Sequence, residues 1–169
     1  MYFCFMNGSP RQQKSFHLSR ALGRVASLQR TCLKQALREE PGIELEWYYF
    51  LHTINTRKAT RKTDLISINL LFEPTTGIDI LNRMIRAGLL VEKIDPADKR
   101  ARLLSITKEG KNILIRAERE AHKIADLLFG DLPAAQQEAI QQLLTAIENK
   151  HLPQLTAPPR TKIRPQGLF

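Results

Sequence analysis

The turn DPADKR, residues 95–100, places two acids and two bases between two apolar runs of the chain. Arg100 carries a guanidinium that is permanently charged and weakly hydrated, and narrow minor grooves of DNA attract such a group through their concentrated negative potential. Asp98 stands two residues earlier, where an ion pair would hold the Arg100 side chain outward. Lys99 and Arg102 are placed to reach phosphates. We therefore predict that this turn contacts a nucleic acid; the alternative is a solvated turn with surface charges.

The charge balance of the whole chain favours a polyanionic partner. Lysine and arginine number 26 against 17 aspartate and glutamate residues, which gives a formal net charge of +9. Such an excess favours nucleic acid and, less strongly, an anionic membrane surface. The bases also cluster, because residues 1–38 contain seven bases and no acid, and the segment TRKATRK, residues 56–62, contains four. The bases of that segment are predicted phosphate contacts, with an ordinary solvated loop as the alternative: Arg57, Lys58, Arg61 and Lys62.

Length and composition exclude a membrane protein. The 169 residues suit one compact domain with appendages, and a hydrophobic content of 43% is ordinary for a globular protein. No apolar run reaches the roughly 18 residues that span a bilayer. The apolar start MYFCFM lacks the basic region of a signal peptide. We therefore expect a cytoplasmic protein without a membrane segment.

Residues that serve in catalytic or metal sites lack the spacing that such sites need. Cys4 and Cys32 form no ligand cluster, and the four histidines are scattered along the chain. The sequence contains no nucleophile–base arrangement, no phosphate-binding loop and no paired carboxylates of clear purpose. We therefore expect no metal site, no cofactor and no enzymatic activity.

The elements that must position the charged turn follow from hydrophobic periodicity. Apolar residues recur at steps of three and four along most of the chain, and proline or glycine interrupts the pattern between segments. Two β-prone runs, LLVEKI and ARLLSIT, flank the charged turn and predict a hairpin. We therefore expect a mainly α-helical protein with a hairpin near its centre. The predicted helices cover residues 15–38, 43–56, 62–71, 75–88, 108–129 and 134–150.

This order of elements predicts a winged helix-turn-helix domain over residues 43–107, with the hairpin as its wing. The long helices of residues 15–40 and 108–152 carry apolar stripes that so small a domain cannot bury. They predict a helical dimerisation region formed by both chain ends. Residues 1–14 form an N-terminal segment. Residues 153–169 are rich in proline and bases, which predicts a flexible tail.

The helix predicted over residues 75–88 is the candidate recognition helix. Thr75 or Thr76 can cap its start, and Gly88 stands where a helix ends in a left-handed turn. A helix of this kind enters the major groove with its polar face. The alternatives are that the threonines only cap the helix and that Arg83 makes an internal ion pair. The residues predicted to face the major groove are Thr75, Thr76, Ile78, Asp79 and Asn82, and those predicted to face the backbone are Arg83 and Arg86.

Residues 78–114, IDILNRMIRAGLLVEKIDPADKRARLLSITKEGKNIL, closely resemble the core of the multiple-antibiotic-resistance regulator (MarR) family. The residues that match the family's recognition helix, wing and following helix are Arg83, Met84, Gly88, Leu89, Asp95, Pro96, Asp98, Arg100, Thr107 and Gly110. Proteins of this family are dimeric winged-helix transcription factors. The resemblance thus implies a homodimer on double-stranded DNA, and a repressor that a small-molecule effector releases. The alternative is an architectural or protein-interaction winged-helix protein that needs no ligand.

The sequence departs from the family's pattern at two places. Gly77 stands where a buried aliphatic residue is usual, and glycine weakens a helix by about 1 kcal/mol relative to alanine. Ile78 and Asp79 stand where the family often has polar or basic DNA contacts, and an acid at position 79 repels phosphate. Asp79 therefore either accepts a hydrogen bond from a cytosine amino group or is held in an ion pair.

The segment EWYYFLH, residues 46–52, packs four aromatic residues into the second predicted helix. The resemblance implies that small aromatic effectors lodge near this element, between the dimerisation helices and the winged domain. Trp47, Tyr48 and His52 are the candidate pocket residues, although burial in the core accounts for most of the aromatics.

Cys32 is a candidate redox residue. One branch of the family senses peroxide through a thiol in this region, and Arg30 and Lys34 flank Cys32 in the sequence. The resemblance also includes tyrosines near such a thiol, which the segment LQRTCLKQ lacks. A small buried residue is therefore the favoured interpretation of Cys32.

Overall fold

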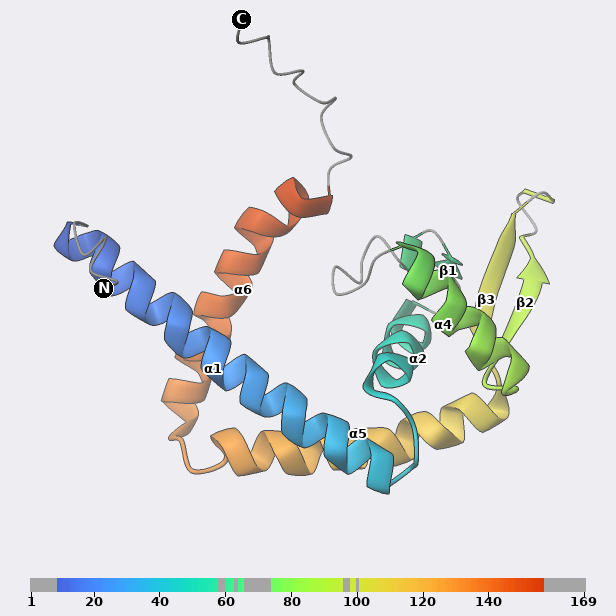
Figure 1. The fold of residues 1–169 in the computed structure, drawn as a ribbon, viewed down its shortest axis with the longest axis horizontal. Helices are drawn as coiled ribbons and strands as arrows, with labels where there is room; N and C mark the ends of the chain where they lie inside the picture. Colours follow the sequence, from blue (N-terminus) through green and yellow to red (C-terminus); the bar gives the residue numbers. More distant parts are fainter. Residues whose placement is uncertain are drawn as a thin grey trace, which may run out of the picture.

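The computed structural model describes residues 9–57, 60–62, 64–65, 74–95, 98–99 and 101–156 of the chain. Figure 1 shows a lobe of short helices and strands at one end of α5, and long helices at the other. The elements are α1 (Pro10–Glu39), α2 (Leu45–Arg57), β1 (Thr60–Arg61), α4 (Pro74–Arg86), β2 (Leu90–Ile94), β3 (Arg102–Ile106), α5 (Lys108–Phe129) and α6 (Ala134–Thr156). The mainly helical winged fold predicted from the sequence is confirmed.

The first helix begins earlier than the periodicity predicted. Ser9 caps α1 through a capping box, in which Ser9 Oγ accepts from the Gln12 amide and Gln12 Oε1 accepts from the Ser9 amide at 2.7 Å. Pro10 fills the first helical position, where its missing N–H costs nothing. The predicted start at residue 15 is therefore wrong, because local capping chemistry extends the helix beyond its apolar stripe.

The described core lies between the second half of α1, the winged lobe and α5. Only Leu33 and Leu37 of α1 are buried, and they pack with α2 and the first half of α5. Burial of this kind is the main favourable term in folding, at about 25 cal/mol per Å² of apolar surface. The core residues that are fully buried are Leu37, Leu45, Phe50, Leu51, Ile54, Leu65, Leu81, Met84, Leu104 and Ala117.

In the described part of the chain the strands form an antiparallel sheet in the order β1-β3-β2. The hairpin register pairs Leu90 with Ile106 and Ile94 with Arg102, which confirms the predicted wing. The strand β1 was not predicted, because two residues carry no periodic signal. It pairs Thr60 with Leu104. The predicted helix of residues 62–71 lies for the most part outside the described residues.

The last two helices extend the fold away from the winged lobe (Figure 1). The bounds predicted for α5, residues 108–129, are confirmed. The predicted end of the last helix near residue 150 is wrong, because α6 continues to Thr156 through Pro153. A proline inside a helix removes one backbone hydrogen bond and kinks the helix without always ending it. The rest of the predicted tail lies outside the described residues.

Candidate nucleic-acid interface

One face of α4 is buried and the other is exposed to solvent. Ile80, Leu81 and Met84 pack into the core at helical spacing, and Gly77 is buried on the same face. The helix begins at Pro74, so Thr75 and Thr76 lie in its first turn and the predicted cap at these residues is wrong. The predicted groove and backbone residues that are exposed are Thr75, Thr76, Ile78, Asp79, Arg83 and Arg86.

Two residues of α4 make contacts that the sequence did not predict. The Arg83 guanidinium stands 5.7 Å from the centroid of the Trp47 ring, an arrangement in which a cation is attracted to the face of an aromatic ring. Asn82 is half-buried and its Oδ1 accepts a hydrogen bond from Lys62 Nζ at 3.0 Å. Both side chains therefore connect the candidate recognition helix to neighbouring elements.

The junction between α4, the wing and α5 depends on Thr107 and Gly110. Thr107 Oγ1 donates to the Gly88 carbonyl oxygen at 2.7 Å and accepts from the Gly110 amide at 3.0 Å, which caps α5. Gly88 turns the chain with a φ of +74°, a conformation that favours glycine. A Cβ added at Gly110 would stand 2.3 Å from the Leu89 carbonyl oxygen, so the close approach of the two segments requires glycine.

The turn at the tip of the wing is part of a cluster of opposite charges. Arg61 Nη2 lies 3.0 Å from Asp95 Oδ2 and 3.6 Å from Asp98 Oδ2. The hydrogen bond from Arg61 to Asp95 raises the pKa of the guanidinium, so Arg61 keeps its charge. Backbone bonds close the turn, since the Asp95 amide donates to the Ala101 carbonyl at 3.1 Å and the Ala101 amide to the Asp98 carbonyl at 2.8 Å.

Arg100, the residue predicted to enter the minor groove, lies outside the described residues. Asp98 was predicted to hold Arg100 and contacts Arg61. Lys99 and Arg102 are exposed beside the turn. Among the predicted phosphate contacts, Arg57 is exposed at the end of α2, Lys62 is ion-paired with Glu92, and Lys58 lies outside the described residues.

The candidate effector residues lie on two sides of α2. Trp47 lines a cavity of about 480 Å³ together with residues of α1 and α4, including Arg30, Thr76 and Arg83. The Trp47 Nε1–H is buried and, within the described residues, has no hydrogen-bond partner. Arg30 pairs with Glu46 at 3.5 Å across the same region. The sequence did not predict this cavity, because its lining comes from three helices.

Tyr48 and His52 lie on the side of α2 that packs against α5. Their ring centroids are 6.1 Å apart, and His52 Nδ1 lies 3.4 Å from Glu118 Oε1. Burial raises the pKa of the Tyr48 phenol, and the Glu118 carboxylate raises it further. A single compact ligand beside Trp47 therefore does not reach all of the predicted pocket residues without rearrangement.

Cys32 is a free, partly buried thiol within α1. Among the residues that the structure describes, no group of three or more histidine, cysteine, aspartate or glutamate side chains could hold a metal ion. None of the described helices combines the length and the apolar character that crossing a membrane requires.

Comparisons with known proteins agree with this geometry. Residues 45–110 match the family model of a winged helix DNA-binding domain. The transcriptional regulator HosA of Escherichia coli O111:H- is 29% identical over 138 residues, which cover 82% of this chain and 97% of HosA. Residues 45–110, which match the family model, contain α4, the hairpin of β2 and β3, and Thr107.

Solved structures of low sequence identity share the fold. A MarR family transcriptional regulator from Streptomyces coelicolor, in complex with DNA, superposes with a TM-score of 0.71 at 18% identity and covers 88% of this chain and 92% of its own. An organohalide-sensing transcriptional regulator in its 2,4-dichlorophenol-bound form gives a TM-score of 0.70 at 16% identity, with both chains fully covered. The chain is therefore a winged helix DNA-binding protein with the fold of the MarR-family transcriptional regulators.

Proposed function

We propose that this chain forms a cytoplasmic homodimer that binds double-stranded DNA in a sequence-specific manner and represses transcription until a small aromatic effector releases it. The observation that carries the proposal is the exposed polar face of α4 beside a wing with exposed bases. The core fixes α4 by its opposite face, so its polar side chains are presented on a rigid element. Contacts to base edges then supply specificity, and contacts to phosphates supply affinity.

Each predicted contact has a chemical role in this proposal. Ile78 is exposed and suits the methyl group of thymine, and Asp79 suits the amino group of cytosine. Arg100 is proposed for the minor groove, with Lys99 and Arg102 on phosphates. The remaining proposed contacts are Thr75, Thr76 and Asn82 in the major groove, Asp98 at the wing, and Arg57, Lys58, Arg83 and Arg86 on the backbone. Arg61 and Lys62, also predicted on phosphates, are ion-paired within the domain.

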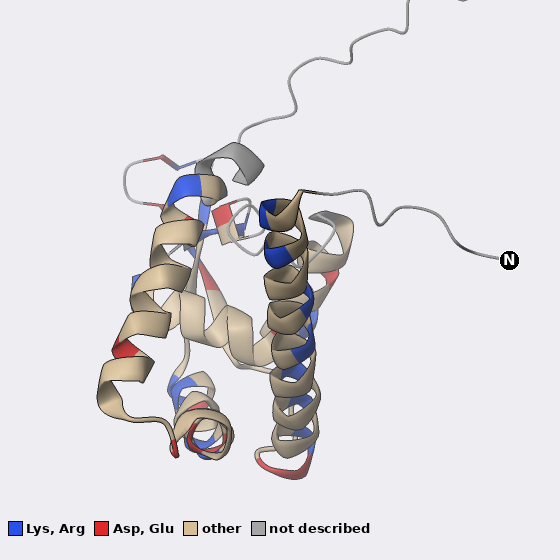
Figure 2. Cartoon of the chain, turned by 90° about the vertical axis from the view of Figure 1, so that its left-hand side faces the viewer, with Lys and Arg blue, Asp and Glu red and all other residues tan. Residues whose placement is uncertain are grey.

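The unburied apolar surface of the long helices supports a homodimer. Every described side chain from Ala134 to His151 is exposed, although Leu143 and its neighbours form an apolar stripe. The first half of α1 likewise exposes Leu18 and Leu22, and lysines and arginines recur along the same helix (Figure 2). Soluble monomers rarely leave so continuous an apolar surface uncovered.

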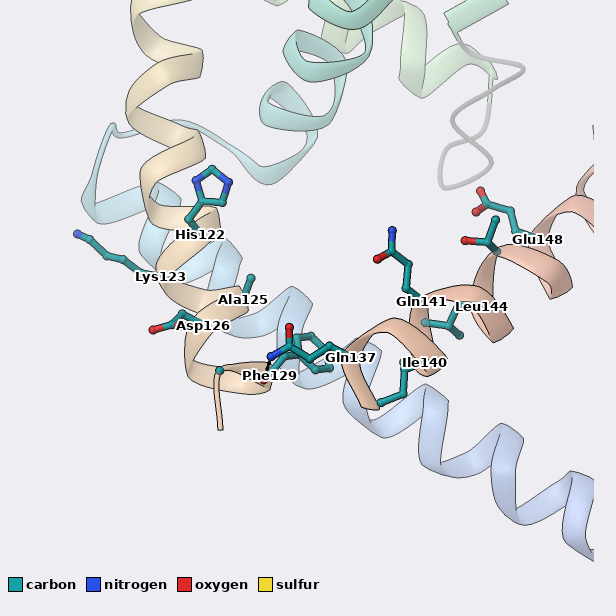
Figure 3. A pocket seen from close by; sticks show the side chains of 12 residues that line it. His122, Lys123, Ala125, Asp126, Phe129, Gln137, Ile140, Gln141, Leu144 and Glu148 are labelled. Atoms are coloured by element: carbon teal, nitrogen blue, oxygen red, sulfur yellow. Dashed lines mark hydrogen bonds between the residues drawn. The ribbon is translucent and has the colours of Figure 1, made fainter. Parts of the chain in front are cut away.

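A groove between α5 and α6 adds to this surface. It measures about 830 Å³ and is lined by Phe129, Ile140 and Leu144 together with polar residues such as Gln141. Figure 3 shows these side chains on facing turns of the two helices, with the space between them open. We propose that helices of a second copy fill this groove and bury the stripes of α1 and α6. The two recognition helices would then face successive turns of the duplex.

The cavity beside Trp47 supports the effector part of the proposal. Its lining includes Thr76, Ile80 and Arg83, which belong to the recognition helix. A ligand there would contact α4 directly, so binding would shift the recognition helix relative to the dimerisation helices. Tyr48 and His52 lie on the α5 side of α2, away from this cavity, and are proposed to contact an effector only after a rearrangement.

Selection of bound duplexes from a random pool tests the DNA-binding proposal. We expect enrichment of a pseudo-palindromic site with half-sites about one helical turn apart. Failure to enrich any sequence at low ionic strength would contradict sequence-specific binding.

The fluorescence of Trp47, the single tryptophan of the chain, tests the effector proposal separately. We expect quenching by phenolic compounds, and no response to any of them would refute the effector while leaving DNA binding intact.

A further inference from the structure

The side chains of Arg61 and Lys62 form hydrogen bonds and ion pairs within their own domain, although the segment that contains them was predicted to bind phosphates. Arg61 Nη2 donates to Asp95 Oδ2 at 3.0 Å, and the Asp95 side chain is only 12% exposed. Arg61 also lies 3.6 Å from Asp98 Oδ2. The guanidinium therefore ties the turn at the tip of the wing to β1, outside the hairpin.

Lys62 makes a second bridge in a different direction. Its Nζ donates to Asn82 Oδ1 of α4 at 3.0 Å and forms an ion pair with the Glu92 carboxylate of β2. Lys62 is about one-quarter exposed, less than a lysine on an open surface. The same ammonium group thus joins the recognition helix to the first strand of the wing.

Backbone pairing leaves the position of the wing weakly determined. The strand β1 has two residues and pairs only with β3, at Thr60–Leu104 and Arg61–Leu103, among the described residues. The hairpin projects beyond the rest of the sheet (Figure 1). Arg61 contacts the turn at the tip of the hairpin, where Lys99 stands, and Lys62 contacts β2. Contacts that fix this turn and β2 decide whether the wing and α4 reach their grooves together.

We propose that Arg61 and Lys62 are positioning residues that hold the wing at a fixed angle to the recognition helix, and that phosphate neutralisation is not their main role. The inference rests on the proposed DNA binding. Asp95 and Glu92, the ion-pair partners of Arg61 and Lys62, fix the position of the wing and do not contact DNA.

Neutralising the carboxylates distinguishes a brace of the wing from a simple change in charge, because the two change the affinity for DNA in opposite directions. The Asp95→Asn and Glu92→Gln substitutions each remove a negative charge near the DNA, so charge alone would strengthen binding. Loss of the brace weakens it instead, and we expect a decrease in affinity on the order of tenfold, as for other coupled contacts. Glu138→Gln on α6 is the matched control and should change affinity little. Equal or tighter binding by Asp95→Asn and Glu92→Gln would overturn the proposal.

The salt dependence and additivity of the Arg61→Gln variant give an independent measurement. A phosphate contact of Arg61 itself lowers the salt slope by about 0.9 in Arg61→Gln alone, whereas a mispositioned wing changes the slope equally in Arg61→Gln and Asp95→Asn. We expect the same slope in the two single variants, and an Arg61→Gln/Asp95→Asn double variant that binds no more weakly than the weaker single variant. A slope lower by about one in Arg61→Gln alone, with additive losses, would assign Arg61 to a phosphate.

Hydrogen exchange of the free protein tests the brace without DNA. Amides of residues 90–106 should exchange faster in Asp95→Asn and Lys62→Gln than in the wild type, while those of α5 remain protected. Unchanged exchange in both variants would refute the brace. Should the wild type ignore every duplex, the proposed function fails, and this experiment still decides whether Arg61 and Lys62 hold the wing.

Discussion

Thr107 and Gly88 are joined by a hydrogen bond of 2.7 Å, from the threonine hydroxyl at the start of α5 to the carbonyl oxygen that follows α4. The same hydroxyl oxygen accepts from the Gly110 amide, so one side chain both caps α5 and fastens the turn that follows α4. The end of α4 is therefore joined to the start of α5 through the Thr107 side chain.

Replacing Thr107 by alanine should destabilise the protein. The substitution removes an N-cap, which typically costs about 1 kcal/mol of unfolding free energy. It also leaves the Gly88 carbonyl oxygen without this donor. Thr107→Ser keeps the hydroxyl and should lose much less. Denaturant unfolding monitored by circular dichroism measures both variants, and equal stability of the two would contradict a capping role.

Replacing Arg86 by glutamine should weaken DNA binding in a salt-dependent way. Arg86 is exposed in the last turn of α4 and is proposed to neutralise a phosphate. Removing one such contact lowers the slope of log affinity against log salt by about 0.9, with a similar loss on all sequences. Fluorescence anisotropy over a salt series gives the slope. Arg24→Gln on α1 removes the same charge outside α4 and the wing, and an equal effect in both variants would argue against a specific contact.

Replacing Leu144 by glutamate should break the proposed dimer. Leu144 is 42% exposed in the single chain and lines the groove between α5 and α6. A charge buried there without a partner would cost several kcal/mol in the dimer interface and little in the monomer. Sedimentation equilibrium measures the oligomeric state. Gln136→Glu introduces the same charge in the first turn of α6 and should remain dimeric, whereas a wild-type monomer would contradict the dimer itself.

Stability at alkaline pH should depend on Tyr48. Its pKa is raised by burial and by Glu118, so the folded protein favours the neutral phenol. The stability that the neutral phenol contributes is fully present below about pH 10, the pKa of tyrosine in the unfolded chain. It is lost as the pH rises through the higher pKa of the folded state. Tyr48→Phe should therefore lose less stability than the wild type above about pH 10, with a constant difference at lower pH. Parallel losses in the two proteins would show that Tyr48 is not in the buried environment described.

Local patterns predicted most of the elements and the family resemblance. The bounds of α5 were correct, because Thr107 supplies a cap and an apolar stripe follows it at helical spacing. The hairpin was predicted from two β-prone runs around a charged turn and is confirmed, whereas its register came only from the structure. The start of α1 was predicted wrongly at residue 15, although Ser9 and Gln12 form a recognisable capping box with Pro10 at the first helical position.

The sequence by itself determined which segments are helical, which form the wing and which residues carry charge, because those properties depend on neighbours within a few positions. Only the tertiary structure decided what the charges do. Arg61 meets Asp95 across 34 positions and Lys62 meets Asn82 across 20, and neither pair leaves a local signal. Likewise, α2 turns Trp47 toward α4 and the neighbouring Tyr48 toward α5, because successive residues of a helix point about 100° apart and packing selects the face each one meets.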